Sequence, residues 1–148
     1  MANDPYVSGV HKAPPYSAKR PVEGELCAIL TSRHHDRGLE LIPQPSRAFG
    51  GGEVHEILRT SQREVRSRDR VDEVFGLGFV AITAPGLVLT GDQVTVGDDV
   101  VGVVVGFDET HYPNHYNIVV AAPEGDERTG EQLEVDLDQP IHFRRVAK

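Results

Sequence analysis

The ten residues from Asp108 to Asn117 carry the densest group of acid, base and hydrogen-bonding side chains in this sequence. They lie between two apolar segments, residues 100–105 and 118–122, that read as strands. A hairpin needs only a few turn residues to join two strands. The polar side chains of this loop are Asp108, Glu109, His111, Tyr112, Asn114, His115, Tyr116 and Asn117. Polar groups gathered on a loop that rigid strands hold in place are typical of a binding or catalytic site.

The histidines of this loop suit proton transfer, because histidine titrates near neutral pH. The catalytic candidates are His111, His115, Tyr112 and Asp108. The residues expected to bind and orient a substrate are Asn114, Asn117, Tyr116 and Glu56. The set fits a small enzyme of the isomerase, lyase or cyclase type that performs acid/base chemistry on a small organic molecule. A non-catalytic barrel that binds a small ligand or forms oligomers is the alternative, since a binding pocket needs the same polar groups.

A divalent metal ion is a second use for the same histidines. Glu53 and His55 lie two apart on a predicted strand, so they share one face and would meet His111 or His115 inside a barrel. Two histidines and a carboxylate are the ligand set of mononuclear zinc and iron sites. We therefore expect that any bound metal is a divalent ion held by His55, His111, His115 and Glu53. No tight spacing such as Cys-x-x-Cys strengthens this prediction, and chance clustering of the seven histidines is the alternative.

Several classes of cofactor and partner are excluded. The three glycines at residues 50–52 lack the following helix and the Lys or Ser/Thr of a phosphate loop, and no dinucleotide-binding motif is present, so we expect neither a nucleotide nor a flavin. The formal net charge of −8 argues against nucleic acid or an anionic membrane as the partner. The sequence shows no signal peptide, and its only cysteine, Cys27, has no internal disulfide partner, so we expect a cytoplasmic protein with Cys27 buried in a core strand.

Short apolar runs separated by turn residues fill most of the chain. The predicted strands are residues 26–31, 39–42, 53–60, 77–83, 87–89, 93–96, 100–107, 115–122, 133–137 and 141–144, with a hairpin loop at 32–38 between the first two. This spacing, with β-branched residues in the strands, predicts an all-β fold: a small closed or partly open β-barrel at residues 22–148 with at most one short helix. The strands at 100–107 and 115–122 are apolar on both faces, so they should be covered on both.

The turn at residues 90–94 resembles a turn found in several small Greek-key and pseudo-barrel folds. In those folds the aspartate accepts hydrogen bonds from backbone amides and the glycine takes a positive φ. The resemblance implies these roles for Asp92 and Gly91, and it supports the prediction of a small barrel.

Residues 59–73 follow neither the helical nor the strand period, because five arginines alternate there with carboxylates. A long exposed hairpin and a short helix are both compatible with the pattern. We predict a strand to about Thr60, then a loop with a helical turn whose mixed charge forms a solvated face. An anion clamp built from the arginines is the alternative.

The N-terminal residues 1–21 contain four prolines and no hydrophobic period, which predicts an extended or disordered arm. A barrel with strands that are apolar on both faces needs an outer cover, yet no long amphipathic helix is available to supply it. We therefore expect a homo-oligomer, most simply a dimer, in which the arm could lie across the neighbouring subunit.

Overall fold

A computed structural model describes residue 4, residue 7 and residues 15–146 of the chain. The main sheet consists of β1 (Val22–Ile29), β2 (Arg33–His34), β5 (Val54–Thr60), β7 (Val74–Ala84), β9 (Gln93–Val96), β10 (Asp99–Asp108), β11 (Asn117–Ala121) and β12 (Pro140–Arg144). Two short pairs lie outside it, β3 (Leu39–Glu40) with β6 (Arg70–Val71), and β4 (Ser46–Phe49) with β8 (Gly86–Leu89). One short helix, α2 (Gly130–Leu133), lies within residues 15–146.

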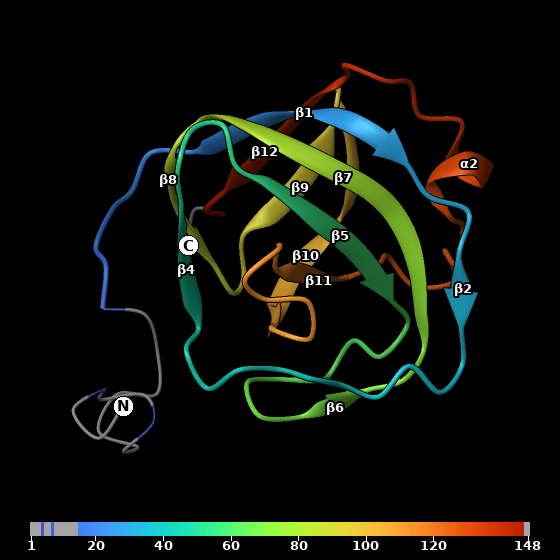
Figure 1. Ribbon diagram of the computed structural model, residues 1–148, viewed down its shortest axis with the longest axis horizontal. Helices are drawn as coiled ribbons and strands as arrows, with labels where there is room; N and C mark the ends of the chain where they lie inside the picture. The colour runs from blue at the N-terminus through green and yellow to red at the C-terminus, as the bar shows by residue number, and fades with distance from the viewer. Residues whose placement is uncertain (1–3, 5–6, 8–14, 147–148) are drawn as a thin grey trace.

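The main sheet closes on itself into a barrel (Figure 1). Its strand order is β1-β12-β9-β10-β11-β5-β7, and β7 pairs back with β1. All neighbours in this ring are antiparallel except β11 and β5, which run parallel. A closed ring leaves no unpaired edge strand in the barrel wall. The predicted all-β barrel with at most one short helix is therefore confirmed.

Alternation of apolar and polar residues decides which side chains fill the barrel. In β1, Val22 and Leu26 point inward and are fully buried, while Glu23 and Glu25 between them are exposed. In β12, Ile141 and Phe143 are likewise buried. These side chains join one continuous core cluster inside the ring. The period of two that the sequence shows is thus the period that builds the interior.

The prediction that Cys27 is buried is wrong. Cys27 is exposed, and its Sγ lies 3.5 Å from the Phe79 carbonyl oxygen. The reason is the register of β1: Leu26 points inward, so the next residue must point outward. A short apolar run does not show which of its residues face the core.

A second, smaller apolar cluster covers part of the outer wall. Val119 of β11 is buried there against Leu39 and Val71, which belong to the β3–β6 pair. All five residues of β11 are buried, so this strand is covered on both faces as predicted. Strand β10 is covered only in part, because the β3–β6 pair does not extend over all of it: Val100 and Val103 remain 46% and 39% exposed.

Two predicted elements are wrong. Residues 32–38 do not join β1 and β3 as a hairpin, because β1 pairs with β12 and β7 instead. Residues 133–137 do not form a strand, because α2 ends at Leu133 and Glu134 adopts a left-handed conformation (φ 59°). Thr129 and Gln132 form a capping box that starts this helix. Gly130 lets α2 approach β7 closely, since a Cβ there would lie 1.9 Å from the Leu77 carbonyl oxygen.

The segment that was ambiguous in the sequence is a strand as far as Thr60, as predicted, and residues 61–69 then form turns without a helical turn. The expected solvated face does not extend to Arg59. Its side chain is 0% exposed and forms an ion pair with Asp126, with Nη2 and Oδ2 2.8 Å apart. Arg59 is buried together with the neighbouring apolar residues Ile57 and Leu58 of β5.

The predicted arm lies mostly outside the described residues. Within residues 15–21, Lys19 forms an ion pair with Asp92 at 2.9 Å, and the Tyr16 carbonyl accepts a hydrogen bond from Arg145. Asp92 also accepts the Leu89 backbone N–H at 3.0 Å, as the resemblance of its turn implied. No helix among the described residues is long and apolar enough to cross a membrane.

Candidate functional site

The loop at residues 109–116 joins β10 to β11 and is held at both ends by Asp108. This carboxylate is 3% exposed and accepts three hydrogen bonds: from Glu40 N (3.1 Å), Thr110 N (2.9 Å) and Asn117 Nδ2 (3.0 Å). An aspartate that accepts backbone amides in this way fixes the conformation of a turn. Asp108 therefore orders the loop and the neighbouring β3 segment.

Within the loop, a turn brings its two histidines together. His111 O accepts hydrogen bonds from the backbone N–H groups of Asn114 (2.8 Å) and His115 (3.3 Å). The two imidazole rings stack with centroids 5.0 Å apart and planes inclined by 28°. The turn thus brings two histidines that are four residues apart side by side, as a helix would bring them onto one face.

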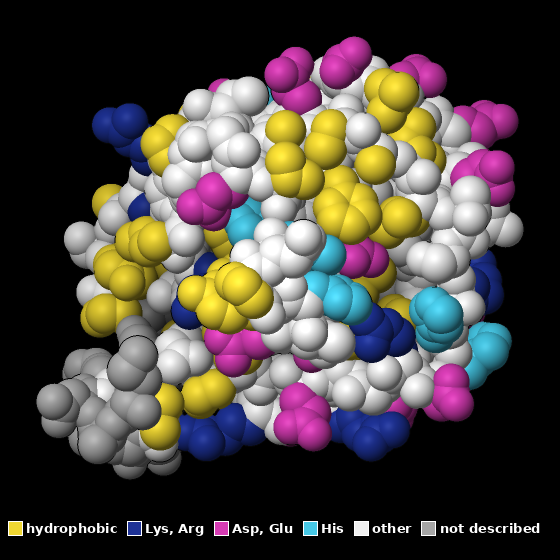
Figure 2. Space-filling view, in the orientation of Figure 1, with side chains coloured by type: hydrophobic (Ala, Val, Ile, Leu, Met, Phe, Trp, Pro, Cys, Tyr) yellow, Lys and Arg dark blue, Asp and Glu magenta, His cyan; other side chains and the backbone are white. Residues whose placement is uncertain are grey.

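The register of the wall places Glu56 beside these histidines. Asn117 of β11 is opposite Glu56 of β5, and Glu56 is opposite Phe79 of β7, so the three side chains share the outer face. His115 Nε2 lies 3.1 Å from Glu56 Oε1, and the His115 ring meets Phe79 edge-on at 5.1 Å. Ligand atoms of Glu56, His111 and His115 all lie within 4.8 Å of one another. Figure 2 shows histidine side chains gathered on this face beside acidic and basic groups.

Outer hydrogen bonds orient both rings. Asn114 Oδ1 lies 2.6 Å from His115 Nδ1, so the Nδ1–H donates to the amide and Nε2 faces Glu56. Arg37 Nη2 lies 3.1 Å from His111 Nε2, and since a guanidinium only donates, this Nε2 accepts. A metal-binding histidine typically donates its second ring N–H to such a partner. His115 has this arrangement, whereas His111 accepts from Arg37. The Glu56 and His115 side chains are only 15% and 12% exposed.

A pocket of about 380 Å³ opens next to this cluster, at the end of the barrel. It is lined by Arg47, Ala48, Glu53, Val54, His55, Tyr112, Pro113, Asn114, His115 and Tyr116. We call it the mouth pocket, and we call the loop at residues 109–116 the histidine loop. His115 and Asn114 belong to both. A molecule bound in the mouth pocket would therefore lie beside the Glu56–His111–His115 cluster.

His55 is held as a neutral imidazole in the mouth pocket. The Tyr116 backbone N–H donates to Nδ1 at 3.0 Å, so the ring hydrogen is on Nε2 and donates to Glu53 Oε1 at 2.8 Å. Burial lowers the pKa of His55, although Glu53 acts in the opposite direction. The hydrogen bond from His55 lowers the pKa of Glu53 in turn. The pair is thus a neutral histidine and an ionised carboxylate.

Tyr116 supplies a protonated hydroxyl. Its side chain is buried, and Arg47 Nη2 donates to the hydroxyl oxygen. Burial raises the pKa of Tyr116, although the Arg47 charge acts to lower it. The phenol therefore keeps its own O–H, which can donate to a bound molecule. Tyr112, which is exposed, lies against it with ring centroids 5.2 Å apart.

The sequence of the chain matches one protein family. The model of the family described as "Family of unknown function (DUF6917)" matches residues 16–144. The chain belongs to this family. The match covers every strand of the barrel and the loop at residues 109–116, so all residues of the candidate site lie within the matched segment. No curated protein and no solved structure matches the chain.

The DUF6917 chain brings most of the predicted site residues together. His111 and His115 meet Glu56, whereas Glu53 and His55 form their own pair in the mouth pocket. Other predicted residues that line this pocket are Tyr112, Asn114 and Tyr116. Asp108 and Asn117 are buried beneath the loop and bond to each other.

Two arginines of the site were missed in the sequence. Arg37 lies on the segment between β2 and β3, and Arg47 lies on β4. Each is a single arginine that belongs to no sequence motif, so nothing in the sequence indicated that it is part of a site.

Proposed function

We propose that the protein binds one divalent transition-metal ion through Glu56, His111 and His115, and that it performs acid/base chemistry on a small organic molecule in the mouth pocket. One observation carries the proposal: three ligand atoms from two distant segments lie within 4.8 Å of one another. Two imidazoles and one carboxylate are the ligand set of mononuclear zinc and iron(II) sites with open positions. The ion would take the place of the direct contact between His115 Nε2 and Glu56 Oε1.

The surroundings of the three residues favour a metal over a simple ion pair. Asn114 already holds His115 Nδ1, which leaves Nε2 directed at the cluster. Phe79 forms an apolar wall at one side, so water is partly excluded there. The ligands are nitrogen and oxygen atoms, and Cys27 is on β1 outside this group, so the proposed ion is not a soft one such as copper(I).

The mouth pocket supplies an acid and a base to a substrate next to the ion. The Tyr116 hydroxyl keeps its proton because burial raises its pKa, so it can donate. Glu53 is ionised because His55 stabilises the carboxylate, so it can accept. An isomerase, lyase or cyclase needs such a pair around the reacting atoms. These roles support the enzyme over the non-catalytic binding barrel.

Metal binding is tested by calorimetric titration of metal-free, tag-free protein with Zn²⁺. We expect one ion per chain. The variants E56Q and H115A should each bind more weakly by more than the roughly 10–100-fold that the loss of an outer partner causes. The matched control is His35→Ala, which removes the histidine of an exposed His35–Glu73 pair at 2.9 Å elsewhere on the surface. Equal affinity in wild type and H115A would contradict the proposal.

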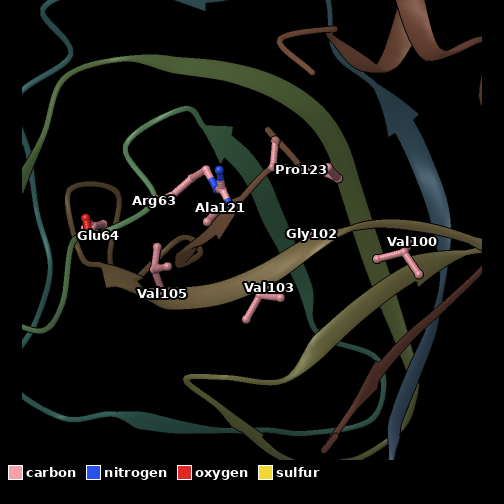
Figure 3. Close-up of a pocket in the computed structure, with 9 residues that line it drawn as sticks. Arg63, Glu64, Val100, Gly102, Val103, Val105, Ala121 and Pro123 are labelled. Atoms are coloured by element: carbon pink, nitrogen blue, oxygen red, sulfur yellow. The ribbon is translucent and has the colours of Figure 1, made fainter. Parts of the chain in front are cut away.

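We also propose that two copies associate through the uncovered outer face of β10. Val100 and Val103 are exposed there, and a pocket of about 600 Å³ lies over this face (Figure 3). Light scattering should give about twice the chain mass of 16.2 kDa. Val103→Glu would place a charge in the contact and should yield monomers without loss of the circular dichroism spectrum. A monomeric wild type at tens of micromolar would refute the dimer.

A further inference from the structure

Arg47 is a cation in the mouth pocket without a carboxylate partner. Among the described residues, no Asp or Glu oxygen lies within 4.0 Å of its guanidinium. Its only hydrogen bond there joins Nη2 to the Tyr116 hydroxyl, and its Cζ lies 4.2 Å from the centre of the Tyr116 ring. Nε is buried and has no hydrogen-bond partner. The Arg47 side chain as a whole is half-buried. An arginine that is partly removed from water is normally paired with an anion, because an uncompensated charge is costly to bury.

The nearest acid in the mouth pocket does not neutralise Arg47. Glu53 lines the same pocket but directs Oε1 at His55 Nε2, 2.8 Å away. The Arg47 charge still lowers the pKa of Glu53, after the larger effects of the His55 hydrogen bond and its environment, so both groups are charged in one pocket. The guanidinium therefore has donors to offer, including Nη1, which forms no hydrogen bond to the described residues.

The remaining walls combine aromatic rings with polar side chains. Tyr112 and Tyr116 lie side by side at 5.2 Å, and Pro113 completes this side of the pocket. His115 also lines this pocket and belongs to the Glu56–His111–His115 cluster. The volume of about 380 Å³ is near the small end of the range of ligand pockets, roughly 300–1,000 Å³.

We propose that the mouth pocket binds a small monocarboxylate, with its carboxylate on Arg47 and its body against Tyr112 and Tyr116. A guanidinium and a carboxylate match in shape and charge. One unpaired cation beside an ionised Glu53 suits a monoanion better than a phosphate dianion, which would meet more repulsion. The proposal that a monocarboxylate binds depends only on the pocket. The further step, that this monocarboxylate is the substrate, rests on the proposed function.

The test uses metal-free, ¹⁵N-labelled full-length protein titrated with benzoate and, separately, with benzyl alcohol. Benzoate should bind with a millimolar Kd and shift amide signals of residues 47–55 and 112–116. Benzyl alcohol has the same ring without the charge and should bind at least tenfold more weakly. In Arg47→Met benzoate binding should fall by at least tenfold, while Arg47→Lys, which keeps the charge but not the planar fork, should be intermediate. Near-identical spectra elsewhere show that the variants are folded.

Each of three results would overturn the inference. These are equal binding of benzyl alcohol and benzoate, equal binding by wild type and Arg47→Met, and tighter binding of inorganic phosphate than of benzoate. Failure of benzoate and acetate to bind at 20 mM would also overturn it. The Zn²⁺ titration of Glu56→Gln is independent of these readouts. Metal binding without carboxylate binding would leave the proposed metal site standing and remove only this inference.

Discussion

Replacing Asp126 by asparagine is expected to lower the free energy of unfolding by about 3–5 kcal/mol. Asp126 is the counter-ion of Arg59, whose side chain is 0% exposed. The guanidinium contacts Oδ2 through Nη2 at 2.8 Å and lies 5.3 Å from the centre of the Phe75 ring. Without the carboxylate, a full positive charge remains buried, and only neutral acceptors remain beside it: the Arg128 carbonyl and the amide oxygen of the new side chain. An unpaired buried charge is among the most destabilising single changes.

Removing the arginine of this pair instead of the aspartate should lower the free energy of unfolding by less. In Arg59→Met, Asp126 keeps the ion pair with Arg128, with Nε and Oδ1 3.1 Å apart, and it is partly exposed. The double variant R59M/D126N should therefore be no less stable than D126N. Urea unfolding followed by circular dichroism measures all three, since the chain has no tryptophan. The control is Glu127→Gln, whose exposed contact with Arg33 is 3.9 Å long and should matter little. A D126N variant as stable as this control would contradict the expectation.

The same pair predicts a loss of stability in acid. Burial alone would raise the pKa of Asp126, but the hydrogen bonds from Arg128 and the charge of Arg59 together lower it below its usual value of 3.8. In the window below that value the unfolded chain binds the proton more readily than the folded one. The stabilisation is therefore present above pH 3.8 and is lost as the pH falls through the folded pKa. The difference in stability between wild type and D126N should narrow over this window.

The barrel could be predicted because its signals are local. Alternation in β1 and β12 and turn residues between the strands depend only on neighbours in the sequence. The strand pairing that closes it could not be predicted: the parallel pairing of β5 with β11 joins residues about sixty positions apart, as Glu56 with Asn117. Strand β4 was missed because only four residues separate Pro45 from Gly50. The four residues of α2 are too few for a helical period, and only its capping box marked it.

In the candidate site, too, the features that depend on sequence neighbours could be predicted, and those that depend on strand pairing could not. His111 and His115 were predicted together because they share one loop. Glu56 was predicted as a substrate-binding residue, and Glu53 and His55 of the same segment were predicted as metal ligands. Which carboxylate meets the histidines depended on which face of β5 points inward. The strand begins at Val54, so Glu53 precedes it, and His55 packs inside against Phe49 while Glu56 faces out. A one-residue difference in register exchanges the two faces.

Replacing Lys19 by methionine is also expected to lower the free energy of unfolding by about 3–5 kcal/mol. The Lys19 and Asp92 side chains are 5% and 1% exposed, and Nζ lies 2.9 Å from Oδ2. Asp92 Oδ1 has no hydrogen-bond partner, so the ammonium and the Leu89 N–H are the main stabilisation of this carboxylate. Without Lys19 the turn before β9 holds an unpaired anion, and the segment before β1 loses one of its contacts with the rest of the chain.

The double variant K19M/D92N separates charge from packing. An asparagine at position 92 is uncharged and still accepts the Leu89 N–H through its carbonyl oxygen, so K19M/D92N should recover much of the stability lost in K19M. Arg20→Met is the matched control, because it removes a neighbouring exposed cation and should change stability little. Thermal unfolding by circular dichroism would compare the three. A K19M variant that unfolds at the temperature of Arg20→Met would show that the Lys19–Asp92 pair does not secure residues 15–21 to the barrel.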